Sequence, residues 1–196
     1  MNITIKPLTP KLAAEYFDFF ENRAFADDSP YRCYCQIFQM SKAEHKAECD
    51  KLDELDPAIA SRKLAEQQIE TGALQGYLAY IDDVSIGWCN ANNRANYPAD
   101  PQFDVPFHAP AESREMAVVC FEIAPNYRGK GVATALLQRV IADAATEGYI
   151  AVIGFPVTRD ERYEWDHHGP MRLYEKAGFV KMSEQNGFVT MRKELF

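Results

Sequence analysis

The sequence contains no apolar run that approaches the roughly 18 residues of a membrane-spanning helix, so no span is expected. It also lacks an excess of positive charge, because 21 Lys and Arg stand against 29 Asp and Glu, a formal net charge of -8. That balance argues against a general nucleic-acid surface and against anionic membranes. The N-terminus alternates like a strand and has no signal-peptide core. The five cysteines, irregularly spaced, are typical of a reducing compartment, and we expect a cytoplasmic protein.

Two common phosphate-binding patterns are missing as well: the P-loop G-x-x-x-x-G-K-[ST] and the dinucleotide pattern G-x-G-x-x-G. Residues 118–137 nevertheless predict an apolar strand, a loop with two glycines and an amphipathic helix in direct succession. Such a turn leaves backbone N–H groups unpaired at the helix start, where the helix dipole favours an anion. Gly129 and Gly131 would allow close approach, and Arg128 and Lys130 add positive charge.

The spacing of Arg128, Gly131 and Ala133 resembles the coenzyme A signature [QR]-x-x-G-x-[GA] of the GNAT superfamily of N-acetyltransferases. Further on, residues 173–179 read LYEKAGF and resemble the L-Y-E-K-x-G-F segment that closes the last helix of that family. The resemblance covers residue 74 to the C-terminus well, and the earlier residues only by their order of elements. It implies an α/β (α+β) GNAT acyl-CoA N-acyltransferase fold: one domain over residues 1–196, with a mixed, mostly antiparallel central sheet flanked by helices.

Periodicity and turn signals predict elements in the order that this family has. Capping-box spacing at Ser41 and Glu44 predicts a helix start, and Asp82-Asp83 and Asn186-Gly187 predict hairpin turns. The expected strands are 2–8, 74–81, 84–91, 115–124, 149–155, 179–184 and 188–193, and the expected helices are 9–25, 41–51, 57–72, 129–147 and 169–177.

Two loops, 92–114 and 156–168, are longer than a compact domain needs, and both carry aromatic residues. Long aromatic loops beside a cofactor cleft are candidate walls for the acceptor. The alternative, on an equal footing, is that their aromatic side chains only anchor each loop to the body of the protein.

The resemblance implies acetyl-CoA (coenzyme A) as co-substrate, with no metal expected. The backbone at the end of the fourth strand would face the pantetheine arm, and the amides of the glycine loop would hold the pyrophosphate. For Arg128 and Lys130, a solvated pair at a loop tip is the alternative. His167 stands where the family often has an asparagine, seven residues before Tyr174. The expected cofactor-binding residues are Ile123, Ala124, Arg128, Gly129, Lys130, Gly131, Val132, Ala133 and His167.

An acceptor amine must lose a proton, which costs about 4–5 kcal/mol at pH 7 for a lysine-like amine of pKa near 10.4. Glu122 is the first candidate for the base, because it is a carboxylate within an apolar strand near the cofactor. The alternative is that Glu122 pairs with a cation across the sheet. Glu115, Glu112 and His108 are weaker candidates.

Tyr174 matches the position of the general acid in the family. A hydrogen bond that stabilises the leaving sulfur is the safer role, and a core aromatic residue is the alternative. Together these residues predict an N-acetyltransferase that moves an acetyl group directly from acetyl-CoA to a primary amine in a ternary complex. The acceptor would be a small molecule or a peptide, and a homodimer is possible. A non-catalytic acyl-CoA-binding sensor and an acyl group longer than acetyl are alternatives.

The cysteines allow two further hypotheses. Cys33, Cys35, His45 and Cys49 could together hold zinc, although their spacing matches no standard zinc module and free cysteines are commonly buried apolar groups. Cys89 and Cys120 lie in expected strands and are predicted to be core residues. A ping-pong route through Cys120 is conceivable, but direct transfer is simpler.

Overall fold

A seven-stranded sheet forms the centre of the protein, which a computed structural model describes over residues 2–26, 33–52, 57–101, 105–158, 167–185 and 187–196. The strands are β1 (Thr4–Pro7), β2 (Gly76–Ile81), β3 (Val84–Asn93), β4 (Glu115–Ile123), β5 (Ala151–Gly154), β6 (Val180–Gln185) and β7 (Phe188–Glu194). Their order across the sheet is β1-β2-β3-β4-β5-β7-β6. The mixed, mostly antiparallel sheet expected from the sequence is confirmed.

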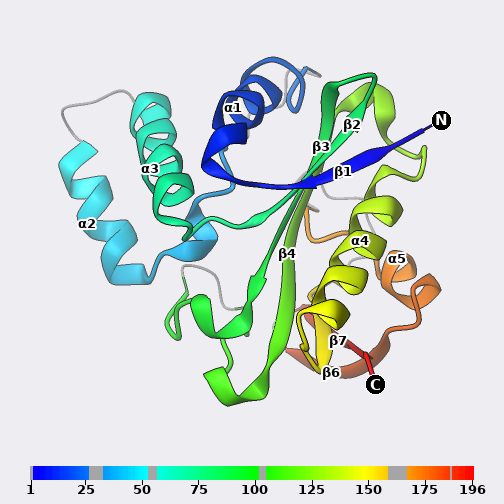
Figure 1. The fold of residues 1–196 in the computed structure, drawn as a ribbon. Coiled ribbons are helices and arrows are strands. Elements are labelled where there is room, and N and C mark those ends of the chain that lie inside the picture. The colour runs from blue at the N-terminus through cyan, green and yellow to red at the C-terminus, as the bar shows by residue number, and fades with distance from the viewer. Residues whose placement is uncertain (1, 27–32, 53–56, 102–104, 159–166, 186) are drawn as a thin grey trace.

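Helices lie on both sides of this sheet (Figure 1). One side carries α1 (Ala13–Asn22), α2 (Lys42–Leu52) and α3 (Pro57–Thr71), and the other carries α4 (Val132–Thr146) and α5 (Met171–Lys176). Short 3-10 helices cover residues 10–12, 37–39, 94–96, 111–113 and 125–127. The expected helices are all present, with ends displaced by a few residues. Within the described residues, none of the helices is long and apolar enough to cross a membrane.

Local sequence signals account for several element ends. Ser41 and Glu44 form the predicted capping box: Glu44 N–H donates to Ser41 Oγ (3.1 Å), and Ser41 N–H donates to Glu44 Oε2 (2.8 Å). Asp82 and Asp83 both have positive φ (49° and 63°) and join β2 to β3 in the predicted hairpin. Gly178, with φ of 84°, follows the end of α5. For the second predicted hairpin, Asn186 lies outside the described residues.

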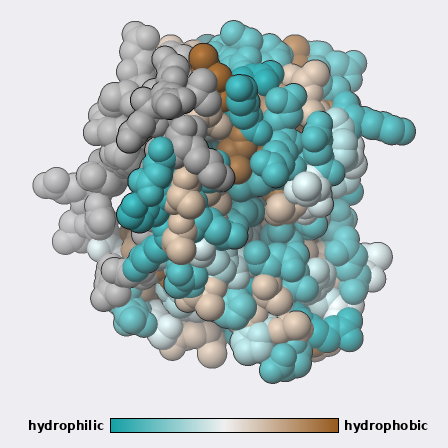
Figure 2. Space-filling model, turned by 90° about the vertical axis from the view of Figure 1, so that its left-hand side faces the viewer, coloured by the Kyte–Doolittle hydropathy of each residue, from teal (hydrophilic) through white to brown (hydrophobic). Residues whose placement is uncertain are grey.

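Two apolar clusters bury the two faces of the sheet. On the α1 side, aromatic rings dominate, and Tyr16 of α1 packs edge-to-face on Trp88 of β3 with ring centroids 4.9 Å apart. On the other side, the α4 residues Leu136, Leu137 and Val140 are fully buried at the helical spacing seen in the sequence. Figure 2 shows the outer surface of the first side, where hydrophilic residues dominate the described area and hydrophobic atoms show only in small patches.

One ladder of the sheet differs from all the others. β4 and β5 run parallel, and their register covers only four pairs, from Glu115↔Ala151 to Val118↔Gly154. The other neighbouring strands pair antiparallel. β5 ends at Gly154, whereas β4 continues to Ile123, so the edge of β4 that faced β5 is left for other groups. We call this edge of β4 beyond Val118, from residue 119 to 123, the wedge.

Candidate functional site

The glycine loop leads from β4 into α4 without a side-chain cap. Gly129 and Gly131 have φ of 74° and 86°, a left-handed conformation that favours glycine, and a Cβ on either residue would meet nothing within 4 Å. Gly131 is the N-cap of α4, and the first helical hydrogen bond runs from Ala135 N–H to Gly131 O (3.0 Å). The N–H groups of residues 132–134 therefore have no acceptor within the helix. Open space, free amides and the absence of acidic residues in the first turn suit a phosphate.

The two cations of the loop do not point the same way. The Arg128 side chain turns back toward β4: its Nε donates to Ile123 O (3.0 Å), and its Nη2 lies 3.4 Å from Glu122 Oε1. Lys130 is exposed, and its Nζ lies 5.6 Å from the ring centroid of Tyr127. Both cations are next to the loop, as predicted, but the guanidinium contacts the strand.

The wedge is filled by the turn at residues 167–169. Phe121 N–H of β4 donates to His167 O (2.6 Å). Tyr174 Oη of α5 donates to His168 O (2.7 Å). His167 and Tyr174, which the sequence places seven residues apart, therefore meet at the same edge of β4.

The side chain of Tyr174 is tightly packed among its neighbours. Its side chain is fully buried, and its ring packs against Phe179 and Phe121 at centroid distances of 5.2 and 6.5 Å. A Cβ at Gly154, the last residue of β5, would overlap the Tyr174 ring. The tyrosine is thus part of the core, and its hydroxyl lies in the wedge. A core position and a hydrogen bond to the leaving sulfur, the two roles considered for Tyr174 from the sequence, are therefore compatible.

Glu122 lies near the end of β4, and the exposed fraction of its side chain is 15%. Its carboxylate contacts Arg128, a cation from the glycine loop that follows the strand. The thiol of Cys120, two residues earlier, has a pKa well above its usual range because of a hydrogen bond with Cys35 and burial, with a smaller contribution from the charge of Glu122. A thiol held neutral is a poor nucleophile, which argues against a ping-pong route through Cys120.

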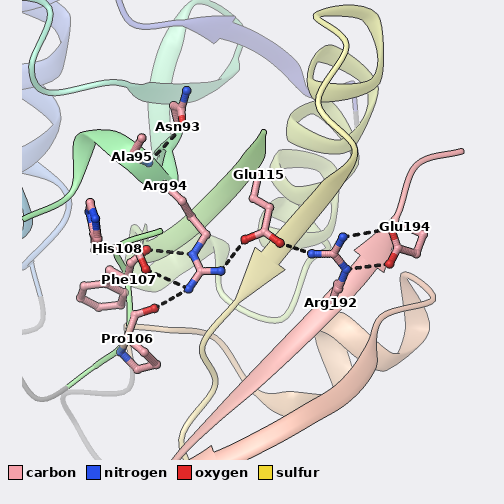
Figure 3. A network of polar contacts seen from close by, with 9 residues as sticks. All are labelled: Asn93, Arg94, Ala95, Pro106, Phe107, His108, Glu115, Arg192 and Glu194. Carbon is pink, nitrogen blue, oxygen red and sulfur yellow. Dashed lines mark hydrogen bonds and ion pairs between the residues drawn. The ribbon is translucent and has the colours of Figure 1, made fainter. Parts of the chain in front are cut away.

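The weaker base candidates have other surroundings. Glu115 accepts from Arg94 and Arg192, which approach it from opposite sides, and Arg192 also pairs with Glu194 (Figure 3). Its carboxylate is therefore committed to two ion pairs. Glu112 is exposed in a short 3-10 helix. His108 is exposed, and its Nδ1 lies 2.7 Å from Tyr97 O.

Arg94 fixes the loop that was predicted to be an acceptor wall. Its guanidinium donates to the carbonyl oxygens of Phe107 (2.9 Å), Pro106 (2.7 Å) and His108 (3.2 Å), as Figure 3 shows. Sequence reasoning missed this residue because its partners are defined only by the folded loop.

Some aromatic residues of the two long loops lie within the described part of the chain. Tyr97 and Phe107 are buried, so both anchor the first loop to the body of the protein. Phe107 also contacts the ring of His168 at 6.0 Å, next to the wedge. Phe103, Tyr163 and Trp165 lie outside the described residues.

His168, a second residue that sequence reasoning missed, gives a prediction about pH. Burial, with a contribution from His167, holds its pKa well below the usual range, so it is neutral in the folded protein. The unfolded chain takes up a proton on this residue below about pH 6.5. The unfolded state then binds more protons, so stability is expected to fall on acidification, by up to about 1.4 kcal/mol per pH unit.

Urea unfolding of the wild type and of His168→Gln between pH 7.5 and 5.5 measures this effect. The pH slope should be smaller in the variant, and His108→Gln, at an exposed histidine, should keep the wild-type slope. Equal slopes in wild type and His168→Gln would contradict the prediction.

The cysteines that the structure describes are free thiols. Cys35, Cys89 and Cys120 are buried, as predicted for the last two, and Cys35 contacts Asn90, whose Nδ2 donates to its carbonyl oxygen (3.2 Å). Among the described residues no group of three or more His, Cys, Asp or Glu is arranged to hold a metal ion. The side chain of Cys49 is not among those described, so the zinc hypothesis is tested only for Cys33, Cys35 and His45.

Comparisons with known proteins agree with this geometry. The profile of the acetyltransferase (GNAT) family matches residues 35–179, well over half of the chain. Comparison with curated proteins finds no match.

Solved structures share the fold at low identity. An acetyltransferase of the GNAT family from Streptococcus pneumoniae is 18% identical, with full coverage of both chains and a TM-score of 0.56. The PaiA N-acetyltransferase of Thermoplasma acidophilum, solved with coenzyme A, is 13% identical, with 99% of each chain covered and a TM-score of 0.55. YncA of Salmonella typhimurium, solved with acetyl-CoA, is 14% identical, with 99% of this chain and 94% of that chain covered and a TM-score of 0.52. With its fold, wedge and glycine loop, and with the family match over residues 35–179, the chain belongs to the acetyltransferase (GNAT) family.

Proposed function

We propose that the protein transfers an acetyl group from acetyl-CoA to a primary amine, directly and in a ternary complex. The observation that carries this proposal is the continuity of two features along one strand. β4 diverges from β5 beyond Val118, and the same strand then leads into an uncapped helix start with open space over Gly129 and Gly131. An extended arm along β4 and a phosphate at α4 together fit the shape of coenzyme A.

The donor would be held mainly by backbone. In this proposal the amides from Gly129 to Ala133 bind the pyrophosphate, because the Arg128 N–H already donates to Pro125 O (3.2 Å), and the backbone at Ile123 and Ala124 lies beside the pantetheine arm. Arg128 and Lys130 add charge, and His167 borders the arm from the wedge. Bound acetyl-CoA would supply the activated acyl group. The residues of the chain then bind, orient and move protons.

Two side chains are assigned to proton and charge transfer. The Glu122 carboxylate would accept a proton from the amine as its nitrogen bonds to the acyl carbon and the carbon–sulfur bond breaks. The Tyr174 hydroxyl would donate a hydrogen bond that stabilises the departing sulfur. Glu122 lies on the cofactor strand and Tyr174 Oη in the wedge, so the two groups would flank the reacting carbon from different elements.

Replacement of Tyr174 by phenylalanine tests the second assignment. We expect kcat to fall about 10- to 100-fold, because one hydrogen bond to the departing sulfur is lost, while the Kd for coenzyme A changes less than about threefold. Steady-state kinetics and calorimetry measure the two quantities. Tyr77→Phe, at a buried tyrosine of β2, is the matched control. Unchanged turnover in Tyr174→Phe would show that the Tyr174 hydroxyl does not stabilise the departing sulfur.

Thiol release from acetyl-CoA tests the activity itself. A panel of polyamines, aminoglycosides, amino acids and peptides should contain at least one amine that accelerates release above the rate of hydrolysis. Mass spectrometry should find that amine acetylated.

A non-catalytic acyl-CoA-binding sensor is the second candidate function. Two contacts favour it: the Tyr174 hydroxyl already donates to His168 O, and Glu122 already pairs with Arg128. Coenzyme A binding without turnover across the whole panel would support the sensor over the enzyme.

A further inference from the structure

A buried polar cluster is centred on Asn90 of β3, whose side chain is fully buried. Asn90 Oδ1 accepts from Tyr97 Oη (3.0 Å) and from Gln39 Nε2 (3.2 Å). Asn90 Nδ2 donates to Cys35 O (3.2 Å). The cluster therefore joins three parts of the chain: the middle of β3, the segment before α2 and the long loop 92–114.

This cluster shares a face of the sheet with Glu122, the proposed base. In the register of β3 and β4, Asn90 pairs with Cys120. Trp88, two residues earlier, pairs with Glu122. Paired residues, and residues two apart along a strand, have their side chains on the same face. Both Trp88 and Cys120 lie in the apolar cluster on the α1 side. Asn90 and Glu122 therefore face that side too, and one repeat of the strand, roughly 6–7 Å, separates their positions.

The hydrogen bonds of Asn90 decide how the amide of Gln39 is oriented. Cys35 O is an acceptor, so the Asn90 amide turns its NH2 group toward it. Asn90 Oδ1 then faces Gln39, which must present its own NH2 group to that oxygen. Gln39 Oε1 is consequently directed away from Asn90. This oxygen is buried, and among the residues that the structure describes it has no hydrogen-bond partner.

Gln39 also lies close to the wedge. It ends the short helix Ile37–Gln39, and the ring of its neighbour Phe38 packs against the ring of His168 at a centroid distance of 6.1 Å. His168 O in turn accepts from Tyr174 Oη, the group assigned to the departing sulfur. The amide of Gln39 is thus next to a side chain that borders the wedge, and it lies over the sheet face of the proposed base.

We propose that Gln39 Oε1 accepts a hydrogen bond from the acceptor, from an N–H or O–H group other than the amine that is acetylated. The inference rests on the proposed function, because it needs an acceptor amine at Glu122. It goes further by naming a substrate class: small amines with a second hydrogen-bond donor several bonds away from the reacting nitrogen. A buried oxygen without a donor costs free energy, and an acceptor that supplies the donor recovers it.

The chemistry of the amide oxygen also predicts which compounds the site rejects. Gln39 Oε1 can only accept, so a second amine, a hydroxyl or an amide N–H on the substrate fits it. An alkyl group at the same place leaves the oxygen unpaired, and a carboxylate faces it with lone pairs of its own. We therefore expect n-alkylamines and ω-amino acids to be poorer acceptors than diamines, amino alcohols and ω-amino amides.

Initial rates with matched acceptors test the proposal in the wild-type protein. Diaminoalkanes, amino alcohols and ω-amino amides, from propyl to hexyl, carry the second donor, and n-alkylamines of the same lengths lack it. The best donor-bearing amine should exceed its n-alkyl counterpart by at least about tenfold in kcat/KM, because a site built around a hydrogen bond discriminates against analogues that cannot make it. Thiol release from acetyl-CoA gives the rates, and mass spectrometry identifies the acetylated product.

A replacement at Gln39 locates the origin of this preference. Gln39→Met removes the amide and keeps the length of the side chain. The preference for donor-bearing amines should fall below about twofold, while the Kd for coenzyme A changes less than about threefold. Tyr97→Phe is the matched control, since it removes another hydrogen bond to Asn90 Oδ1 and leaves the Gln39 amide in place. It should keep the wild-type preference, and thermal unfolding checks that both variants fold.

The outcomes separate this inference from the proposed function. Equal kcat/KM for donor-bearing and n-alkyl amines in wild type would overturn the inference and leave the acetyltransferase standing, since a water molecule would then be enough for Gln39 Oε1. A preference that persists in Gln39→Met, or turnover only of amines outside the matched set, would also overturn it. Acetyl transfer to no amine of the broader panel would defeat the proposed function itself.

Discussion

Glutamate in place of Gly131 is expected to abolish coenzyme A binding, with an increase in Kd of at least about 100-fold, or about 2.7 kcal/mol. Gly131 precedes the first turn of α4, and a side chain there would extend into the open space assigned to the pyrophosphate. Its carboxylate would repel the phosphates and would itself accept from the free amides of the turn. Calorimetry with coenzyme A measures the change, and circular dichroism checks that the variant folds.

Backbone strain alone cannot account for such a result if the controls behave as expected. Gly131 has φ of 86°, and Gly72 has φ of 73° with equally open surroundings but lies at the end of α3. Gly72→Glu should cost the same order of stability, about 1–2 kcal/mol, and leave the Kd unchanged. Gly131→Ala adds strain without charge, and its effect on Kd should be smaller. Tight coenzyme A binding by a folded Gly131→Glu protein would show that the phosphate lies elsewhere.

The largest loss of stability is expected for Glu115→Ala, about 3–5 kcal/mol. Glu115 lies between Arg94 and Arg192, and the exposed fractions of the three side chains are 11%, 13% and 16%. Removal of the carboxylate leaves two poorly hydrated guanidinium groups close together without the anion that neutralises them. The Tm should fall by roughly 6–20 °C for a domain of this size.

Glu194→Gln is the matched control within the same network. Glu194 also pairs with Arg192, but its side chain is 62% exposed, so its loss should cost only about 0–1 kcal/mol. Urea unfolding of the two variants compares them directly. A loss below about 1 kcal/mol for Glu115→Ala would show that water reaches the guanidinium groups well enough to replace the carboxylate.

Features encoded by neighbouring residues could be predicted from the sequence. The capping box at Ser41 and Glu44, the hairpin at Asp82-Asp83 and the succession of strand, glycine loop and helix each depend on residues within a few positions. The order of elements and the sheet class followed from these signals together with the family resemblance. The sequence predicts that α4 starts at 129, whereas it starts at Val132, because two left-handed glycines precede its first turn.

Contacts between distant residues could not be predicted in the same way. Glu115 meets Arg94 and Arg192 across separations of 21 and 77 residues, and no periodicity encodes that encounter. Glu115 therefore looked like a weak candidate base, although the folded chain commits it to two ion pairs. The position of the turn at His167 and His168 inside the wedge has the same origin, because it depends on where β5 ends relative to β4.

The same difference between local and long-range contacts applies to the candidate site. The loop amides, the glycines and the two loop cations were identified from spacing, and the structure brings them to one helix start beside the wedge. The direction of the Arg128 side chain was not predicted, because a flexible arginine chooses among nearby anions only after the backbone is in place. The sequence predicts that Glu122 faces either the acceptor amine or a cation. In the structure its carboxylate lies 3.4 Å from the Arg128 guanidinium.

The short parallel ladder divides the sheet into two antiparallel halves, β1–β4 and β5–β7. Within the sheet, four residue pairs join the halves at one seam. A ligand that lies along β4 in the wedge would extend this seam and add contacts between the two halves of the sheet. Binding would then stabilise the pairing of β4 with β5, and the amide proton of Gly154 at the seam would exchange more slowly, even though this residue need not touch the ligand.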